Sequence, residues 1–247
     1  MRNDLNDIIS NLPAQHSLDW YRVRLGKFTG SQVGRLMHGG RGGEYFSKDA
    51  LAYINEVAAE RMLNEAVVKI DDLFDEYLLQ TTVTNKAMAW GIDNELNAIA
   101  LYQKTLNVKV THCGAFTHES LACFASSPDG LVIEHNGTIE VKCPSIKKHT
   151  EYLCGVRGAY DLKAVDATYY WQVMAHMAVT GADWCDWMSY CPFSRKPLHV
   201  VTIMRDDDAI EKLLNQVAIA DTMAKAICNQ CDEAAIDKKH TAVLNVS

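Results

Sequence analysis

The chain has 247 residues and a formal net charge of −7. This charge argues against a protein that coats nucleic acid non-specifically, because such binding requires an overall basic surface. No apolar run approaches the ~20 residues of a membrane span, and residues 1–15 lack the apolar segment of a secretory signal, so we expect a soluble cytoplasmic protein with no membrane partner.

The eight cysteines have no oxidising compartment in which to pair, and we interpret most of them as small buried hydrophobic residues. Cys228 and Cys231 form a CxxC pair, but no second Cys/His pair stands at a spacing that would complete a zinc site. Proline is scarce, and no flexible linker or internal repeat is visible. We therefore treat residues 1–247 as one domain with a sizeable core.

The N-terminal part predicts helices. Ser17 is placed to cap a short helix that stops at Gly26, and Thr29 with Gln32 resembles a capping box that opens a second one. Two longer amphipathic helices are expected over residues 47–65 and 85–106. Charge is uneven here: residues 20–43 carry five cations and no acid, whereas residues 56–76 are strongly acidic, which suggests a local cationic face on an acidic body.

Residues 108–143 change to short β-rich runs separated by Gly, Ser, Pro and Asn, which is typical of a meander of strands. A helix, two strands and a long helix are expected after it, over residues 166–180, 184–191, 198–204 and 206–231. This order predicts an α/β or α+β fold, with a sheet flanked by helices.

Three charged residues interrupt one of the β-rich stretches, SSPDGLVIEHNGTIEVKCP (126–144). Asp129, Glu140 and Lys142 are poor choices for a half-buried strand, so the stretch is either a solvated ribbon or a site that needs charge. The solvated alternative is a cross-strand pair of Asp129 with Lys142, worth only ~0.2–1 kcal/mol.

The turn of this ribbon decides which residues meet. A four-residue loop over 134–137, with Gly137 in a left-handed conformation, puts Asp129 opposite Lys142 and makes Glu140 its diagonal neighbour at ~7–8 Å. A tighter two-residue turn would separate the two carboxylates by ~13 Å. We favour the longer loop.

Two carboxylates on one face suit Mg²⁺ or Mn²⁺, and no His cluster competes for a softer metal. Such an ion would lower the pKa of bound water and neutralise charge on a phosphoryl oxygen, as phosphodiester hydrolysis requires. Lys142 would hold that water or stabilise the developing negative charge.

Two helices offer further candidates. Glu95 falls inside an apolar stripe, where a carboxylate costs several kcal/mol unless it is paired, ligates a metal, or reaches solvent at the stripe's edge. The stripe consists of Met88, Ile92, Leu96, Ile99 and Tyr102. Gln172 and His176 lie one turn apart on the helix over 166–180; Gln172 suits the orientation of a water or phosphate, and we interpret His176 as a hydrogen-bonded core residue.

Together these segments resemble the lambda exonuclease family, also called the YqaJ-type viral recombinases, within the PD-(D/E)xK nuclease superfamily. The matching segments occur in the family's order: WYRVRLGKFTGSQV (20–33), WGIDNELNA (90–98), SPDG (127–130) followed by EVKCP (140–144), and YWQVMAHM (170–177). The resemblance implies a mixed central β-sheet flanked by helices. It also implies Mg²⁺-dependent digestion of the 5′-ended strand of linear duplex DNA to mononucleotides, which leaves 3′ single strands.

The resemblance assigns roles to particular residues. It makes Asp129, Glu140 and the carbonyl of Val141 ligands of up to two Mg²⁺ or Mn²⁺ ions, with Glu95 completing the set. Lys142 becomes the catalytic lysine, and Gln172 the motif glutamine behind the active site.

A pocket for a 5′-phosphate is also implied, formed by Arg24, Ser31 and Ser127. Arginine binds phosphate through two hydrogen bonds, and a helix that opens near Ser31 would offer unpaired N–H groups. Arg41, in the Gly-rich loop over 38–46, is either a DNA contact or part of a plain flexible segment.

Family members are often ring-shaped homotrimers that act with a single-strand annealing protein, so a phage or prophage enzyme in bacterial cytoplasm is expected. Two alternatives stay open: an endonuclease that uses the same carboxylates, and a non-catalytic adaptor for DNA ends or the annealing protein.

Overall fold

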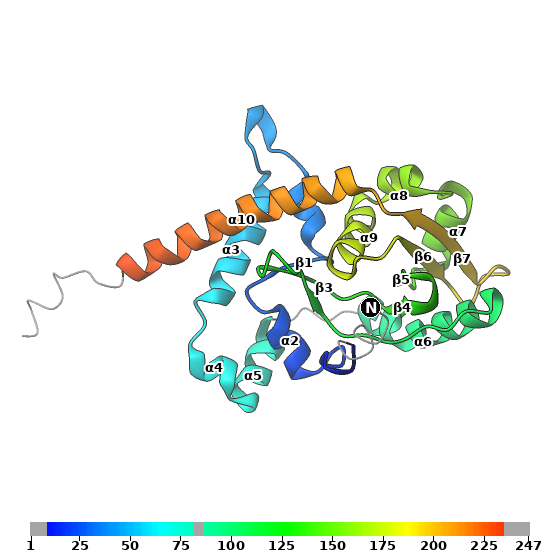
Figure 1. Ribbon diagram of the computed structural model, residues 1–247, viewed down its shortest axis with the longest axis horizontal. Helices are drawn as coiled ribbons and strands as arrows, with labels where there is room; N and C mark the ends of the chain where they lie inside the picture. The colour runs from blue at the N-terminus through cyan, green and yellow to red at the C-terminus, as the bar shows by residue number, and fades with distance from the viewer. Residues whose placement is uncertain (1–8, 82–85, 235–247) are drawn as a thin grey trace, which may run out of the picture.

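The computed structural model describes residues 9–81 and 86–234 and places two β-sheets among helices (Figure 1). The larger sheet has the order β4 (Gly130–Val132), β5 (Gly137–Lys142), β6 (Trp184–Tyr190) and β7 (Leu198–Met204). Its β5–β6 pair is parallel and the other two pairs are antiparallel. The smaller sheet has the order β1 (Phe28–Thr29), β3 (Phe124–Ser126) and β2 (Phe116–Thr117). The expected mixed sheet flanked by helices is confirmed.

Two of the expected N-terminal helices form, one with the predicted cap Ser17 and one with a cap, Ser47, that was not predicted. They are α2 (Leu18–Arg24) and α3 (Lys48–Arg61), and the side chains of Ser17 and Ser47 accept hydrogen bonds from the backbone N–H three residues on. Gly26 has a φ of 67°, a left-handed conformation that glycine adopts without strain, and the chain turns away from α2 there.

The capping box expected at Thr29 is wrong. Thr29 lies in β1, and its backbone N–H donates to the hydroxyl of Tyr53 at 2.7 Å, while Gln32 makes no side-chain capping bond. The strand therefore replaces the first turn, and only the short 3₁₀ helix η1 (Val33–Met37) remains. A second 3₁₀ turn, η2 (Arg41–Gly43), lies in the Gly-rich loop.

The three long helices also form where periodicity predicts them: α6 (Lys86–Leu106), α9 (Ala167–Thr180) and α10 (Asp207–Ala234). Residue 85, the first of one expected helix, lies outside the described residues. Four short helices were not expected: α4 (Glu65–Lys69), α5 (Asp71–Thr81), α7 (Ile146–Gly155) and α8 (Ala159–Val165). Each is short and buries at most two residues.

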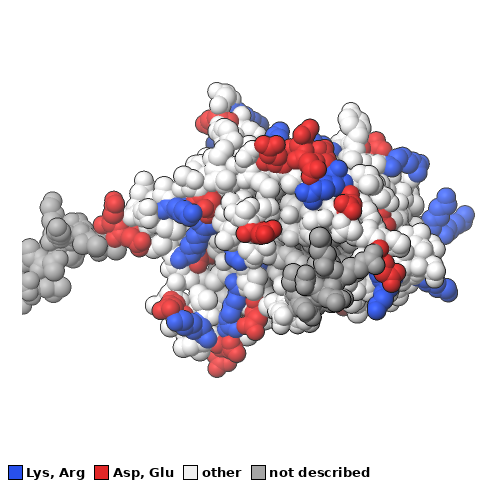
Figure 2. Space-filling model, viewed as in Figure 1, with Lys and Arg blue, Asp and Glu red and all other residues white. Residues whose placement is uncertain are grey.

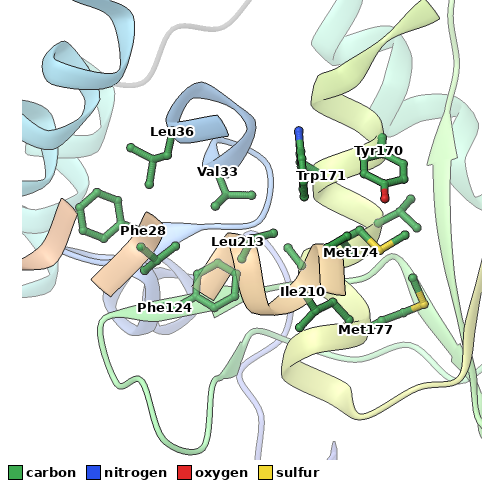
Figure 3. Close-up of a cluster of buried hydrophobic side chains, with 14 of the residues drawn as sticks. Phe28, Val33, Leu36, Phe124, Tyr170, Trp171, Met174, Met177, Ile210 and Leu213 are labelled. Atoms are coloured by element: carbon green, nitrogen blue, oxygen red, sulfur yellow. The ribbon is translucent and has the colours of Figure 1, made fainter. Parts of the chain in front are cut away.

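Alternation along β6 gives the larger sheet two buried faces. Cys185 and Trp187 belong to the cluster formed with α3, α9 and α10, whereas Met188 and Tyr190 belong to the cluster formed with α6. Figure 3 shows the first cluster, to which η1, β3, α9 and α10 all contribute. The sheet is thus held between α6 on one side and α9 on the other (Figure 1).

The ribbon of β4 and β5 has the longer loop that we favoured, but its register differs from the expected one. Val132 pairs with Gly137, so the loop covers residues 133–136, and its left-handed residue is Asn136 (φ 50°). The pairing of β4 with β5 puts Asp129 opposite Glu140 rather than Lys142. Asn tolerates the left-handed conformation well, which lets Gly137 serve another purpose.

We predict that Gly137→Ala lowers the free energy of unfolding by about 1–3 kcal/mol, measured by urea denaturation. A Cβ at this position would overlap Cζ2 of Trp184, so the indole or the strand would have to move. Gly155→Ala is the control, because a Cβ at that helical glycine would meet no atom within 4 Å. Equal urea midpoints for the two variants would show that the packing of Trp184 tolerates a Cβ at residue 137.

No helix within the described ranges is long and apolar enough to cross a bilayer. All eight cysteines are free, but only three are buried, fewer than expected, and Cys231 is exposed on α10. Cys228 donates a weak hydrogen bond to the Ala58 carbonyl at 3.6 Å, which supports a structural role.

Candidate active site

One cavity collects the residues that the sequence singled out. The sequence analysis named ten candidate catalytic, metal-binding and DNA-binding residues. Nine of them line this cavity: Arg24, Ser31, Glu95, Ser127, Asp129, Glu140, Val141, Lys142 and Gln172. They come from α2, α6, β5, α9 and the segments before β4 and after β1, which are far apart in the sequence. Arg41 is the exception, because it lies in an exposed loop outside this cavity.

The alternation of β5 directs two of its charged side chains into the site. Ile139 and Val141 pack with α6, so Glu140 and Lys142 point to the other face of the strand, toward α9. Asp129 lies opposite Glu140 across the ribbon, and the backbone N–H of Val141 donates to its Oδ2 at 2.6 Å. Short-range pairing of two strands therefore sets the spacing of the two carboxylates.

Glu95 reaches the same cavity, but not from the stripe that we expected. Ile92 and Leu96 are exposed by 56% and 63%, and Ile92 lines the cavity, so this part of α6 does not face the core. The buried face of α6 consists of Asn94, Ala98, Ile99 and Tyr102. Glu95 stands at the edge between the two faces and is partly buried.

The three carboxylates differ in their electrostatic surroundings. Burial raises the pKa of Asp129, and the nearby charges of Glu140 and Glu95 raise it further. Burial and the charge of Glu140 also raise the pKa of Glu95. Burial alone would raise the pKa of Glu140, but Lys142 and His176 lower it to about 2. The three carboxylates thus destabilise one another's negative charge, and only Glu140 has cationic and hydrogen-bonding partners that offset this.

Lys142 is bound on two sides. Its Nζ lies 2.5 Å from Oε1 of Glu140 and 4.7 Å from the ring centroid of Tyr169, a cation–π contact. Burial would lower the pKa of Lys142, but Glu140 and Asp129 raise it, so the ammonium stays charged. A fixed positive charge thus stands beside the two carboxylates.

His176 is the hydrogen-bonded core residue that the sequence predicted, but its contact with a carboxylate of the site was not foreseen. It is fully buried, as expected of a core residue, but its Nε2 lies 2.6 Å from Oε2 of Glu140 and its Nδ1 lies 2.8 Å from the hydroxyl of Ser126. An ionised Glu140 only accepts, so Nε2–H donates to it, and a neutral ring then accepts from Ser126. The spacing of one helical turn from Gln172 is the signal that pointed to this position.

The three residues expected to bind a 5′-phosphate lie together at one end of the cavity. The Arg24 guanidinium lies 3.2 Å from the Ser127 hydroxyl and 3.5 Å from that of Ser31, and it stacks 4.2 Å from the ring of Trp20. Trp20 in turn donates its indole N–H to Ser127 at 3.0 Å. Burial lowers the pKa of Arg24, but a guanidinium remains charged at any physiological pH.

Two of the five cations expected to form a cationic face over residues 20–43 are neutralised. Arg22 pairs with Asp19 and Asp71, and Arg35 pairs with Asp49 and Glu56. The acidic segment folds against the basic one, so charges of both signs lie side by side on the surface (Figure 2). Arg24 forms no ion pair with an acid among the described residues, so its positive charge at the cavity is not neutralised.

The chemistry of the donors fits a hard divalent cation: carboxylates from Glu95, Asp129 and Glu140 together with the carbonyl of Val141 are the ligand types that Mg²⁺ and Mn²⁺ prefer. In the part of the chain that the structure describes, no three His, Cys, Asp or Glu side chains are already arranged around one point for a metal ion. Lys142 and His176 hold the oxygens of Glu140 instead.

Comparison with known proteins gives consistent results. The chain is similar to an alkaline exonuclease from Laribacter hongkongensis, with 28% identity over 89% of this chain and 98% of that one, and a TM-score of 0.70. The same exonuclease in complex with dAMP gives a TM-score of 0.71. A phage-related exonuclease from Haemophilus somnus 129PT is 16% identical over 83% of this chain and 96% of that one, and its TM-score of 0.63 shows a shared fold.

No curated protein matches the chain. A family model, however, described as the YqaJ-like viral recombinase domain, matches residues 19–183, which is more than half of the chain. The mixed sheet, the order of the motifs and the exonuclease relatives all agree with that match. The chain therefore belongs to the family of YqaJ-like viral recombinase domains.

Proposed function

We propose that this protein is a Mg²⁺-dependent exonuclease that digests the 5′-ended strand of linear duplex DNA to mononucleotides and leaves 3′ single strands. One observation carries the proposal: the carboxylates, Lys142 and the Arg24 pocket share one cavity. Two bound ions, Mg²⁺ or Mn²⁺, would supply an activated water and neutralise phosphoryl charge. The Laribacter exonuclease was solved with dAMP, a deoxynucleoside monophosphate of the kind that this reaction releases.

The residues divide the work by position. Arg24, with Ser31 and Ser127, binds the terminal 5′-phosphate and so fixes which phosphodiester lies beside Asp129 and Glu140. The oxygen of water bonds to that phosphorus, and the bond to the 3′ oxygen of the first nucleotide breaks. Lys142 stabilises the negative charge that develops. The shortened strand carries a new 5′-phosphate, which fits the same pocket.

We predict that the wild-type protein digests a 5′-phosphorylated duplex at least 10-fold faster than a 5′-hydroxyl duplex, because a charge-assisted hydrogen bond contributes about 1.5–3 kcal/mol. Arg24→Ala should remove most of this difference by slowing only the phosphorylated substrate. The measurement is the initial rate of nucleotide release from the two substrates.

Arg41→Ala is the matched control, because Arg41 lies outside the cavity and should not affect the phosphate preference. An unchanged preference in Arg24→Ala would contradict the role of the pocket. Loss of the phosphate preference in Arg41→Ala would instead support the alternative that Arg41 contacts DNA.

The same assay separates the alternatives. An end-dependent exonuclease leaves circular duplex intact, whereas an endonuclease cuts it. An adaptor releases no acid-soluble nucleotides with or without EDTA. We further propose, from the family resemblance, that the protein is a homotrimer and acts with a single-strand annealing protein. The setting would be phage recombination within bacterial cytoplasm. Light scattering would measure the oligomeric state.

A further inference from the structure

The larger sheet carries a second feature at the end where the active site opens. Lys142 pairs with Ser189 in the parallel register of β5 and β6, and the loop 191–197 follows within two residues. The helix α7 begins at Ile146, two residues after Pro144, which lines the cavity. The loop and α7 therefore adjoin the catalytic cavity.

The loop is held firmly in place. His149 of α7 is fully buried, and its Nε2 lies 2.8 Å from the carbonyl oxygen of Lys196. Its Nδ1 lies 2.8 Å from the hydroxyl of Ser189, and the N–H of Cys191 donates to the Pro197 carbonyl at 2.8 Å. The tip of the loop is thus a preformed surface tied to both α7 and β6.

An aromatic ring stands at this tip. Phe193 is 75% exposed, and one face stacks on Trp90 of α6 with ring centroids 5.5 Å apart and an angle of 19° between planes. Trp90 precedes Gly91, which lines the cavity. The other face of Phe193 is open, although burying a phenylalanine is normally favourable.

Two basic residues follow the ring on the same loop. Arg195 and Lys196 are exposed, and neither forms an ion pair with a described carboxylate, whereas Lys148 on α7 is held by Glu151 at 3.3 Å. In a chain with a net charge of −7, two such cations within three residues of an exposed aromatic side chain form a distinct surface. We call Phe193, Arg195 and Lys196 the aromatic–basic surface.

We propose that the aromatic–basic surface binds the single DNA strand that digestion leaves, with Phe193 stacked on an unpaired base and the two cations on phosphates. Proteins that hold single strands combine these two features, because every base has a face that can stack. Duplex DNA suits the surface less well, since its bases already stack on one another. The proposal rests on the proposed function and adds a site for the undigested strand.

The test measures the dissociation constant of the full-length protein for a fluorescent duplex with a 3′ single-stranded tail and for the matching blunt duplex, in EDTA so that no digestion occurs. Phe193→Ala should weaken binding of the tailed duplex by about 5- to 100-fold and leave blunt binding unchanged. Arg195→Ala with Lys196→Ala should reduce the slope of log affinity against log salt by about 0.7 for each phosphate that the variant no longer neutralises.

Tyr160→Ala and Lys212→Ala are the controls, because Tyr160 is an 84% exposed aromatic on α8 and Lys212 is an exposed cation on α10. The proposal would be overturned if both aromatic–basic variants bound the tailed duplex as tightly as the wild type. A variant that changed only the oligomeric state would also overturn it, because the surface would then be an interface between copies of the chain. Digestion of blunt duplex with Mg²⁺ is scored separately: its absence in the wild type refutes the proposed function, whereas normal digestion with unchanged tail binding refutes only this inference.

Discussion

Lys142→Ala and Glu140→Gln are each expected to reduce cleavage of linear duplex DNA by roughly 10²–10³-fold or more, while DNA binding persists. Lys142 supplies the one ammonium among the described residues that line the cavity and touches Glu140, so its removal takes away charge stabilisation at the reacting phosphate. Glu140→Gln keeps the shape of the side chain and a hydrogen bond to His176, but removes the negative charge that a divalent ion needs.

Lys163→Ala is the matched control for Lys142. Lys163 also lies over a tyrosine ring, 4.5 Å from the centroid of Tyr170, but it is exposed on α8 and does not line the cavity. Single-turnover cleavage and thermal melting should be measured together, so that a folding defect is recognised. Full activity in Lys142→Ala or Glu140→Gln would exclude this cavity as the active site.

His176→Leu is expected to reduce activity by about 10- to 100-fold and to raise the Mg²⁺ concentration at half-maximal rate, as loss of a residue that orients a ligand does. The substitution leaves Oε2 of Glu140 and the Ser126 hydroxyl without their buried partner, which also costs about 1–3 kcal/mol of stability. His176→Gln carries an N–H at a similar reach and should recover part of both losses.

The comparison of these two variants separates positioning from packing. If His176 only fills space, Leu and Gln should behave alike and the Mg²⁺ requirement should not move. A His176→Leu enzyme with wild-type activity and wild-type Mg²⁺ dependence would contradict the role that its contact with Glu140 indicates.

Local signals predicted much of the fold because they act over a few residues. Ser17 caps its helix as predicted, and β7 has the expected bounds. The capping box at Thr29 failed because a hydrogen bond to Tyr53, which lies 24 residues away, holds the backbone in a strand. Tertiary contacts of this kind have no local signature.

The site shows the same division. Asp129, Glu140 and Lys142 were found from charge in a β-rich stretch, but their register was wrong by two residues, since the turn depends on Asn136 and on the packing of Trp184 against Gly137. The contact of His176 with Glu140 was missed because it joins a helix and a strand 36 residues apart.

Charge pairing was equally hidden. The five cations of residues 20–43 suggested a basic face, but Arg22 and Arg35 are neutralised by acids from other elements, and only folding brings those acids close. Arg24 is not neutralised in this way, because it contacts serine hydroxyls and the ring of Trp20. Sequence position alone does not distinguish the two cases.

The most direct test is incubation of the wild-type protein with linear 5′-phosphorylated duplex, with Mg²⁺ or with EDTA, and measurement of the mononucleotides released. If Glu95, Asp129 and Glu140 together bind the working metal, release should require Mg²⁺ or Mn²⁺. Equal release in EDTA, or no release with either Mg²⁺ or Mn²⁺, would contradict the account.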